Sequence, residues 1–444
     1  MQGVAAPDER LSNDDWDKVI DWINENAKRY WLSPGGPLRP PEEGGADVII
    51  IDDPQMPALI PIAKKLAPNR PVIFRRHIQI RSDLIDQPGS PQADTWSWIW
   101  KQVQQADLFI SHPVSIFVPK DVPDEMVGYM PASTDWSVSK DTCMIKLADL
   151  RIRLDGLNKN MREEDVAYYG RVFNSVCRNS GMMTINYPHG KDNSKVIHAD
   201  LCYYKGANQL ADEYIVQIAR FDPSKGIFDV VDSYEKFYRR FTSSLPDRSP
   251  PKLLICGHGS VDDPDGTVIY DSVLAHIEKD LPDLSDKICV VRLGPSDQVL
   301  NALMSKAKVA LQLSTREGFE VKVSEAIHKG TPVIATKAGG IPLQVADKKN
   351  GFLVEVGDTD AVAQHLFDLC TDDDLYERTK KFALEHVCDE VSTVGNALNW
   401  LYLSSKLSKK EEVKPHKQWI NDMARSEAGL EYTAKESRLR RISL

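Results

Sequence analysis

The sequence lacks the patterns that would place the protein in a membrane or in an oxidising compartment. It contains no uninterrupted apolar run of about eighteen residues, the length a membrane-spanning helix needs. Its start, MQGVAAPDERLS, does not follow the basic-then-apolar order of a signal peptide. Its 7 cysteines are scattered and none forms a Cys-x-x-Cys pair, so neither a disulfide framework nor a zinc site is indicated. These absences predict a soluble, cytoplasmic protein without a metal site.

An excess of positive charge is also missing. The chain has 55 Lys and Arg against 65 Asp and Glu, a net charge of −10, which argues against a nucleic-acid or polybasic membrane surface. A composition that is 42% hydrophobic and 27% charged is typical of globular proteins and excludes wholesale disorder. At 444 residues the chain exceeds what one hydrophobic core usually serves, so we expect two or three domains.

The first part of the sequence predicts one helix followed by several buried strands. Apolar residues recur every three or four positions over residues 14–31, which places them on one helix face. Short runs with a continuous apolar centre follow at 47–51, 71–75 and 107–111. Continuous apolarity predicts strands that are covered on both faces, as in a parallel sheet with helical crossovers.

A second series of strands and helices is predicted between residues 210 and 395. Strand–helix alternation at this interval is typical of a doubly wound α/β domain. The candidate strands begin at Tyr214, Lys252, Ile288, Val309, Pro332 and Phe352, and the candidate helices cover residues 228–241, 297–307, 321–330 and 361–370.

These two series define the predicted domains. Residues 1–135 form a partial N-terminal acceptor-side Rossmann-like domain, and residues 210–395 form a C-terminal Rossmann-like domain that binds the donor or phosphate. We interpret residues 136–209 as a linker and insertion. Residues 396–444 form a final helix and a charged tail that we expect to be frayed. Two such units in series place the carboxyl ends of their strands around a crevice, where ligands of open α/β sheets bind.

Two cations flank a turn directly after the strand at Tyr214. Arg220 and Lys225 surround Pro223 and Gly226, just before a predicted helix. Cations beside the free N–H groups of a helix N-terminus suit a phosphate group. A surface ion-pairing turn is the alternative.

Two carboxylates follow the strand at Val309. Glu317 lies in the loop, and Glu325 lies about two turns into the next helix. Carboxylates accept hydrogen bonds from vicinal hydroxyls, and Gly318 lets a backbone N–H approach a ligand closely. The alternative is a solvated helix face, which explains most Glu–Glu pairs.

Two further candidates also follow strands. Gly339 and Gly340 suit an anion or a hydroxyl-rich ligand, but also an ordinary tight turn. His77 ends the strand at 71–75 and could reach into the crevice, although a lone His is more often structural or merely exposed.

The order of these motifs is more specific than any one of them. It resembles the retaining glycosyltransferases with two Rossmann domains (GT-B), in the branch of sucrose- and glycogen-synthase-like enzymes, where an R-x₄-K clamp precedes E-x₇-E and a GG turn. The stretches ADVIIIDDPQMPALIP, FRRHI and STREGFEVKVSEA are most similar to trehalose phosphorylases and trehalose-forming synthases. The resemblance covers residues 47–400 except the insertion.

The resemblance implies a role for each candidate residue. Arg220 and Lys225 would neutralise the phosphate on the departing side of glucose, and Glu317 would hold glucose hydroxyls and stabilise positive charge at the anomeric carbon. Glu325 would bind ribose in a nucleotide-sugar enzyme, or orient the Arg–Lys pair in a phosphorylase. His77 would contact the transferred sugar. The other implied substrate contacts are Gly318, Phe319, Lys322, Gly339 and Gly340, together with Asp52, Asp53 and Gln55 on the acceptor side.

Two departures from the family pattern affect the expectation. Glu320 stands where the family has a second glycine, and Lys322 follows it. A carboxylate would repel a nucleotide diphosphate and an extra lysine would favour free phosphate. The Gly-rich first loop of the family is also not found, so we expect a truncated N-terminal domain with an uncovered sheet edge.

The resemblance implies a retaining glucosyl transfer between trehalose plus phosphate and glucose plus α-glucose 1-phosphate. It needs no cofactor, with inorganic phosphate as substrate and small sugars as partners, and the chain could form a homo-oligomer. The alternatives are a trehalose synthase that uses a nucleotide sugar, and a truncated, inactive sugar-binding relative.

Overall fold

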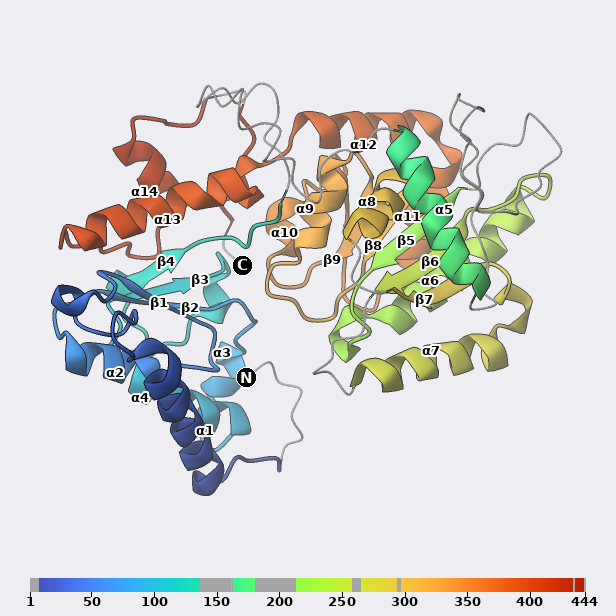
Figure 1. Ribbon diagram of the computed structural model, residues 1–444. Coiled ribbons are helices and arrows are strands. Elements are labelled where there is room, and N and C mark those ends of the chain that lie inside the picture. The colour runs from blue at the N-terminus through green and yellow to red at the C-terminus, as the bar shows by residue number, and fades with distance from the viewer. Residues whose placement is uncertain are drawn as a thin grey trace.

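The computed structural model describes residues 8–135, 161, 163–179, 213–257, 265–293, 297–433 and 436–442. Figure 1 shows two α/β bodies side by side, each a parallel sheet with helices on both faces. This confirms the predicted fold class of two Rossmann-like domains.

The N-terminal domain contains a four-stranded parallel sheet in the order β1-β2-β3-β4, with β1 at its edge. One face packs on α1, α2 and α4 around the buried side chains of Ile60, Phe74, Trp96 and Phe109. The elements are α1 (Asn13–Asn26), β1 (Ile49–Asp52), α2 (Leu59–Leu66), β2 (Val72–Arg75), α3 (Ser82–Ile85), α4 (Pro91–Val103), β3 (Leu108–Ser111) and β4 (Val127–Tyr129).

The end of the chain covers the opposite face of this sheet. Helices α13 (Thr393–Ser408) and α14 (Ile420–Glu427) pack Leu403 and Ile420 against Ile73 and Ile110. In Figure 1 they lie above the N-terminal sheet, although they follow the C-terminal domain in sequence. Strands β2, β3 and β4 are therefore buried on both faces, as their apolar runs predict, whereas the edge strand β1 alternates between buried and exposed residues.

The expectation of a frayed tail is wrong for the described residues beyond α14. Leu439 is 1% exposed and packs with Phe319 and Leu343 of the C-terminal domain. Arg441 makes ion pairs with Glu390 and Asp422. Charge density alone predicts a solvated tail, but Arg441 has a buried partner in Glu390, 51 positions earlier in the sequence.

The C-terminal domain has a six-stranded parallel sheet in the order β10-β9-β8-β5-β6-β7. The chain builds outward from β5 to β7, returns to β8 beside β5, and builds outward again to β10. The strand order therefore reverses between β5 and β8, and such switch points hold the ligands of open α/β sheets. The strands are β5 (Tyr214–Ile218), β6 (Lys252–Gly257), β7 (Ile288–Arg292), β8 (Val309–Gln312), β9 (Val333–Thr336) and β10 (Gly351–Val354).

Helices cover both faces of this sheet. Alternate strand residues point to opposite sides, so Leu253 packs towards α6, α7 and α11, and Leu254 packs towards α8 and α9. Helix α5 lies in the 136–209 region, and its buried Phe173 and Cys177 belong to the second of these cores. The helices are α5 (Glu163–Asn179), α6 (Ile227–Ser244), α7 (Asp265–Asp280), α8 (Asp297–Lys306), α9 (Val321–His328), α10 (Ile341–Gln344), α11 (Thr359–Thr371) and α12 (Asp373–Glu385).

Every predicted strand is confirmed, whereas several elements were missed. The sequence reading overlooked β4, α2, α4, α7, α12 and α14. Strand β4 is only three residues long, and Pro61 inside α2 conceals a helix whose first turn tolerates it. Across the described residues, no helix has the length and apolarity needed to cross a membrane.

Candidate active site at the switch point

The loops after β5 and β8 meet at the point where the strand order reverses. The backbone N–H of Thr315 donates to the carbonyl of Ser224 at 2.7 Å. The buried Gln217 on β5 joins the same loops: its Nε2 donates to the carbonyl of Lys225 at 2.9 Å, and its Oε1 accepts from the N–H of Leu313. These bonds bring the predicted Arg–Lys turn and the predicted Glu loop together.

Lys225 lies between two carboxylates. Its side chain is 11% exposed, and its Nζ donates to Oε2 of Glu317 and, at 2.6 Å, to Oε2 of Glu320. Glu317 Oε1 accepts from the N–H of Gly318 at 3.1 Å. One cation thus joins two acidic groups in a buried cluster at the switch point.

Burial and mutual repulsion set the protonation of this cluster. Burial and the neighbouring Glu320 carboxylate raise the pKa of Glu317 to about 7. Burial opposes ionisation of Glu320 too, but Lys225 outweighs it and lowers the Glu320 pKa. The two carboxylates likewise overcome burial and raise the pKa of Lys225, which stays charged. Glu317 is therefore the member of the cluster that titrates near neutral pH.

The backbone at Glu320 is strained. Its φ is +64°, a left-handed conformation that costs a non-glycine residue about 1–3 kcal/mol. The strain places the side chain at the start of α9, where Oε1 accepts from the N–H of Lys322 at 3.3 Å while Oε2 contacts Lys225. A glycine would adopt this backbone freely but has no side chain to contact Lys225. Glu320, which stands in place of the family's glycine, therefore gives Lys225 a second carboxylate partner besides Glu317.

Gly339 packs directly against the backbone of the loop that contains Glu317. A side-chain carbon at this position, where φ is +49°, would lie 1.7 Å from the carbonyl oxygen of Glu317. The N–H of Gly340 donates to the carbonyl of Gly318 at 3.0 Å. The paired glycines therefore let their own backbone approach that of Glu317 and Gly318 closely. This packing explains the two glycines without any role in ligand binding.

Glu325 is buried and lies beside the two domains' junction. Its Oε1 accepts from the hydroxyl of Thr134 and its Oε2 from Nζ of Lys322, both at 2.6 Å. Lys322 is thus engaged in an ion pair. Thr134 lies 191 positions before Glu325 and was not found from the sequence, since no motif marks it.

Arg220 does not join the buried cluster. Its side chain is 48% exposed, and its ion pair in the structure is with Asp222 at 3.8 Å. Asp222 in turn caps the turn by accepting from the N–H of Ser224 at 2.8 Å. Because the guanidinium is exposed and its ion pair is long, the side chain can reorient towards an arriving anion.

On the N-terminal side, the ends of β1 and β2 place acids beside bases. Asp52 accepts from Arg75 at 3.3 Å and from Nε2 of His77 at 3.1 Å. These interactions outweigh burial and lower the pKa of Asp52. Asp53 has a φ of +62°, and its Oδ1 accepts from the backbone N–H of His77 at 2.8 Å. Parallel register alone explains the first contact, since Asp52 pairs with Arg75 across the sheet.

The two halves of the site meet at His77 and Gly318. A side-chain carbon on Gly318 would lie 2.6 Å from the carbonyl oxygen of His77. His112, which follows β3, donates from Nε2 to that same carbonyl at 2.7 Å and stacks on Phe319. Burial, and then the charge of His77, lower the pKa of His112 to about 3, so its ring is neutral. His112 was missed because a single His after a strand carries no distinguishing signal.

Gln55 remains apart from the other candidates. Its side chain is exposed on the loop after β1, and the described residues provide no hydrogen bond for it. Among all the residues that the structure describes, no group of three or more His, Cys, Asp or Glu side chains is arranged to hold a metal ion.

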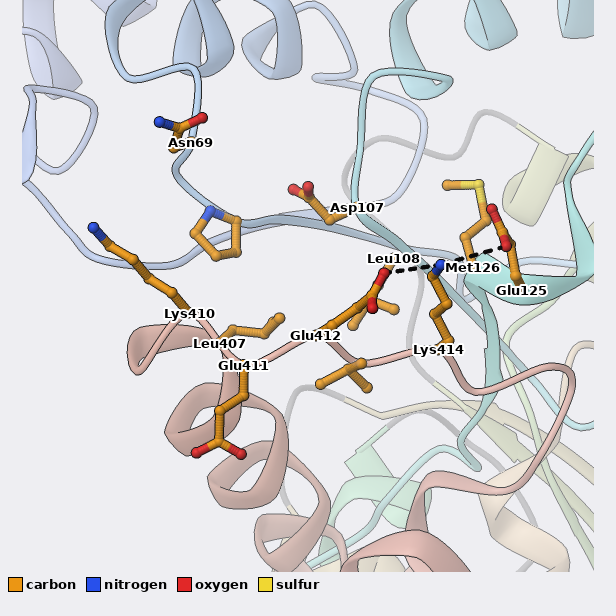
Figure 2. A pocket seen from close by; sticks show the side chains of 12 residues that line it. Asn69, Asp107, Leu108, Glu125, Met126, Leu407, Lys410, Glu411, Glu412 and Lys414 are labelled. Atoms are coloured by element: carbon orange, nitrogen blue, oxygen red, sulfur yellow. Dashed lines mark ion pairs between the residues drawn. The ribbon is translucent and has the colours of Figure 1, made fainter.

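A pocket at the other end of the N-terminal sheet is not part of this site (Figure 2). Pro71, Asp107 and Met126 line it, and each directly precedes a strand. It therefore lies at the amino ends of the strands, whereas ligands of open α/β sheets bind at the carboxyl ends. Lys414 also lines the pocket and makes ion pairs with Glu412 at 2.8 Å and Glu125 at 3.8 Å.

Comparison with known proteins matches both domains to glycosyltransferase families. The family described as "Glycosyl transferases group 1" matches residues 205–386, and "Trehalose synthase, N-terminal domain" matches residues 1–119. Among solved structures, sucrose-phosphate synthase from Thermosynechococcus elongatus is 18% identical, with a TM-score of 0.57 over 92% of this chain and 83% of that one. At such identity the likeness concerns the fold alone.

Curated relatives are more similar in sequence. Trehalose phosphorylase from Pleurotus pulmonarius is 49% identical over 448 residues, covering 100% of this chain and 55% of the relative. Trehalose synthase from Thermococcus litoralis is 30% identical over 341 residues, covering 77% of this chain and 65% of the relative. The chain thus spans about half the length of the phosphorylases it matches. Residues 205–386 thus form a group 1 glycosyltransferase domain, within a chain that has the two-domain GT-B fold.

Proposed function

We propose that this chain transfers a glucosyl group from trehalose to inorganic phosphate, with glucose and α-glucose 1-phosphate as products. The observation that carries the proposal is the buried Lys225 between Glu317 and Glu320 at the switch point, opposite His77. Its similarity to proteins named trehalose phosphorylase supports the choice of substrates.

The residues divide the chemistry between them. The C1–O bond to the departing glucose breaks, and a phosphate oxygen forms the new bond on the same face of the sugar, so the anomeric configuration is retained. The phosphate proton passes to the departing glucose oxygen. Arg220 and Lys225 stabilise the phosphate charge, and an ionised Glu317 stabilises the positive charge that develops at the anomeric carbon. Asp52 and Asp53 hold the departing glucose on the acceptor side, and His77 contacts the transferred glucosyl group.

A phosphate-dependent assay tests this proposal. Trehalose in phosphate buffer should yield glucose and glucose 1-phosphate in equal amounts, and nothing in a buffer without phosphate. Arg220→Ala should reduce the rate about 10²-fold or more, because an electrostatic contact to the reacting group is lost. Well-folded protein that releases no sugar phosphate would reject the proposal.

A nucleotide-sugar-dependent trehalose synthase is the second candidate, because the N-terminal domain matches the trehalose synthase family. Calorimetry with UDP and ADP separates the two. Binding of phosphate without nucleotide favours the phosphorylase, whereas nucleotide binding favours the synthase. If the protein binds trehalose but turns it over with neither phosphate nor a nucleotide, it is an inactive sugar-binding relative.

A further inference from the structure

Arg76 is a buried charge without a hydrogen-bond partner. Its side chain follows β2 and is 2% exposed, yet Nε, Nη1 and Nη2 bond to none of the described residues. Nearly all buried polar groups in proteins are satisfied, and an uncompensated buried charge costs several kcal/mol. A buried unsatisfied group of this kind needs an explanation, and a role in ligand binding is one.

The position of Arg76 points to the acceptor side of the candidate site. Its N–H continues the ladder by donating to Ile110 at 2.8 Å, so its side chain points to the face opposite that of Arg75. Arg75 lies over the ring of Trp400 on α13 and pairs with Asp52. Asp53 lies beside the backbone on both sides of Arg76, because its N–H donates to the carbonyl of Arg75 at 2.9 Å and its Oδ1 accepts from the N–H of His77 at 2.8 Å.

The neighbouring segment contains further unpartnered polar atoms. Oε1 of Gln79 and Oγ of Ser82 are also buried without a hydrogen bond. Burial lowers the pKa of Arg76 to about 10, with Asp53 opposing this shift, so the guanidinium remains charged at neutral pH. The stretch after β2 thus offers guanidinium donors, a nearby carboxylate and two spare acceptors.

We propose that Arg76 and Asp53 form a subsite for the hydroxyl groups of the acceptor-side glucose, a proposal that rests on the function proposed above. A sugar hydroxyl donates to a carboxylate while its oxygen accepts from a guanidinium, so an Arg beside an Asp matches neighbouring hydroxyls. A phosphate group suits the subsite less, because Asp53 repels it. The nitrogens are closed off from solvent, so a sugar reaches them after the covering side chains move.

Arg70 provides a matched control. It is equally buried, at 3% exposure, but its guanidinium donates to the backbone carbonyls of Pro37, Leu38, Arg39 and Ala63. Arg70 is thus a structural arginine whose Nη1 and Nη2 are satisfied and whose Nε alone lacks a partner among the described residues, whereas all three nitrogens of Arg76 lack one.

The test measures glucose and phosphate affinity by calorimetry, and melting temperature without ligand, for Arg76→Met and Arg70→Met. For Arg76→Met we expect an unchanged or higher melting temperature, about 10- to 100-fold weaker glucose binding, and unchanged phosphate binding. For Arg70→Met we expect a lower melting temperature and wild-type glucose affinity, measured below the transition.

Several outcomes would overturn the subsite. These are wild-type glucose affinity in Arg76→Met, a loss of phosphate rather than glucose affinity, failure of Arg76→Met to fold, or a wild-type chain that binds no glucose. Arg76→Lys is a second variant that keeps the charge but loses the planar fork, and it should also bind glucose more weakly. Glucose binding that depends on Arg76 without phosphorolysis would reject the enzyme function alone and leave the subsite standing.

Discussion

The two sides of the candidate site treat buried charge in opposite ways. On the C-terminal side, Lys225 has two carboxylate partners and Glu325 has Lys322 and Thr134. On the N-terminal side, Arg76 is as deeply buried and has no hydrogen-bond partner in the described chain. A satisfied cluster is organised before the substrate arrives, whereas an unsatisfied group gains its partners from a ligand.

The contrast extends to backbone strain. Asp53 and Glu320 both have positive φ, one on each side of the site. At Glu320 the strained backbone is offset by contacts with Lys225 and the start of α9. At Asp53 it is offset by a bond from the N–H of His77 to Oδ1 and by a bond from the N–H of Asp53 to the carbonyl of Arg75. Strain of this kind persists at functional sites because the surrounding structure fixes it.

Lys225→Met removes the cation of the buried cluster on the C-terminal side and should have the largest effect on stability and activity. It leaves Glu317 and Glu320 buried without their cation, so the free energy of unfolding should fall by about 3–5 kcal/mol. Phosphorolysis should fall about 10³-fold or more, because the phosphate contact is lost as well. Urea unfolding and the phosphate-dependent assay measure the two losses.

The double variant Lys225→Met, Glu320→Gln separates these losses. Removing one of the stranded carboxylates should recover part of the stability without recovering activity. Equal recovery of both would show that the cluster is structural only.

Arg441→Met tests the ordered tail and should have the next largest effect. Arg441 bridges Glu390, which is 2% exposed, to Asp422. Its loss leaves Glu390 with the hydroxyl of Tyr432, and the free energy of unfolding should fall by about 3 kcal/mol. The exposed Arg438 is the control, since Arg438→Met removes a charge from the same tail without breaking an ion pair shown by the structure. Equal melting temperatures for the two variants would contradict the role of the tail.

Glu320→Gln should shift the pH dependence of phosphorolysis. The pKa of Glu317 is raised to about 7, first by burial and second by Glu320. If ionised Glu317 is the active form, kcat/KM rises as pH increases through about 7. The variant removes the like charge, so the pKa of Glu317 falls and the rise moves to lower pH. The ionisation of phosphate is the same for both proteins, and a rise at the same pH in both would contradict the prediction.

The same raised pKa has a consequence for stability. A proton on Glu317 favours the folded state, so this contribution is complete below the unfolded pKa near 4.5 and is lost as pH rises through about 7. Wild type should therefore lose stability relative to Glu317→Gln across this window. Urea unfolding of both proteins at the two ends of the window measures the difference.

The sequence predicts the strands and the loops of the site because both depend on local patterns. The runs that form β5 and β8 are mostly apolar, and Lys225 and Glu317 lie in the turns that follow them. Strand ends of a parallel sheet share one edge, so proximity of these residues follows from the fold. Their ion pair does not, because it depends on side-chain directions that the sequence does not specify.

The remaining features depend on contacts between distant segments. Thr134 contacts Glu325 and Leu439 packs with Phe319, although each pair is more than a hundred positions apart in the sequence. The missing partners of Arg76 are equally invisible in sequence, where FRRHI shows two adjacent arginines with no difference between them. One of the two is paired with Asp52 and the other is buried without a hydrogen bond, because successive residues of a strand face opposite sides.

Lys414→Ala should have the smallest effect, since it alters the pocket at the amino ends of the N-terminal strands. Lys414 pairs with Glu412 and Glu125, and its side chain is 47% exposed, so solvent replaces both contacts and the melting temperature should not change measurably. Asp52→Asn, at the carboxyl end of the same sheet, should reduce phosphorolysis because Arg75 and His77 lose their shared carboxylate. If instead Lys414→Ala reduced phosphorolysis and Asp52→Asn did not, the reaction would belong to the pocket of Figure 2, against the rule that places ligands at the carboxyl ends.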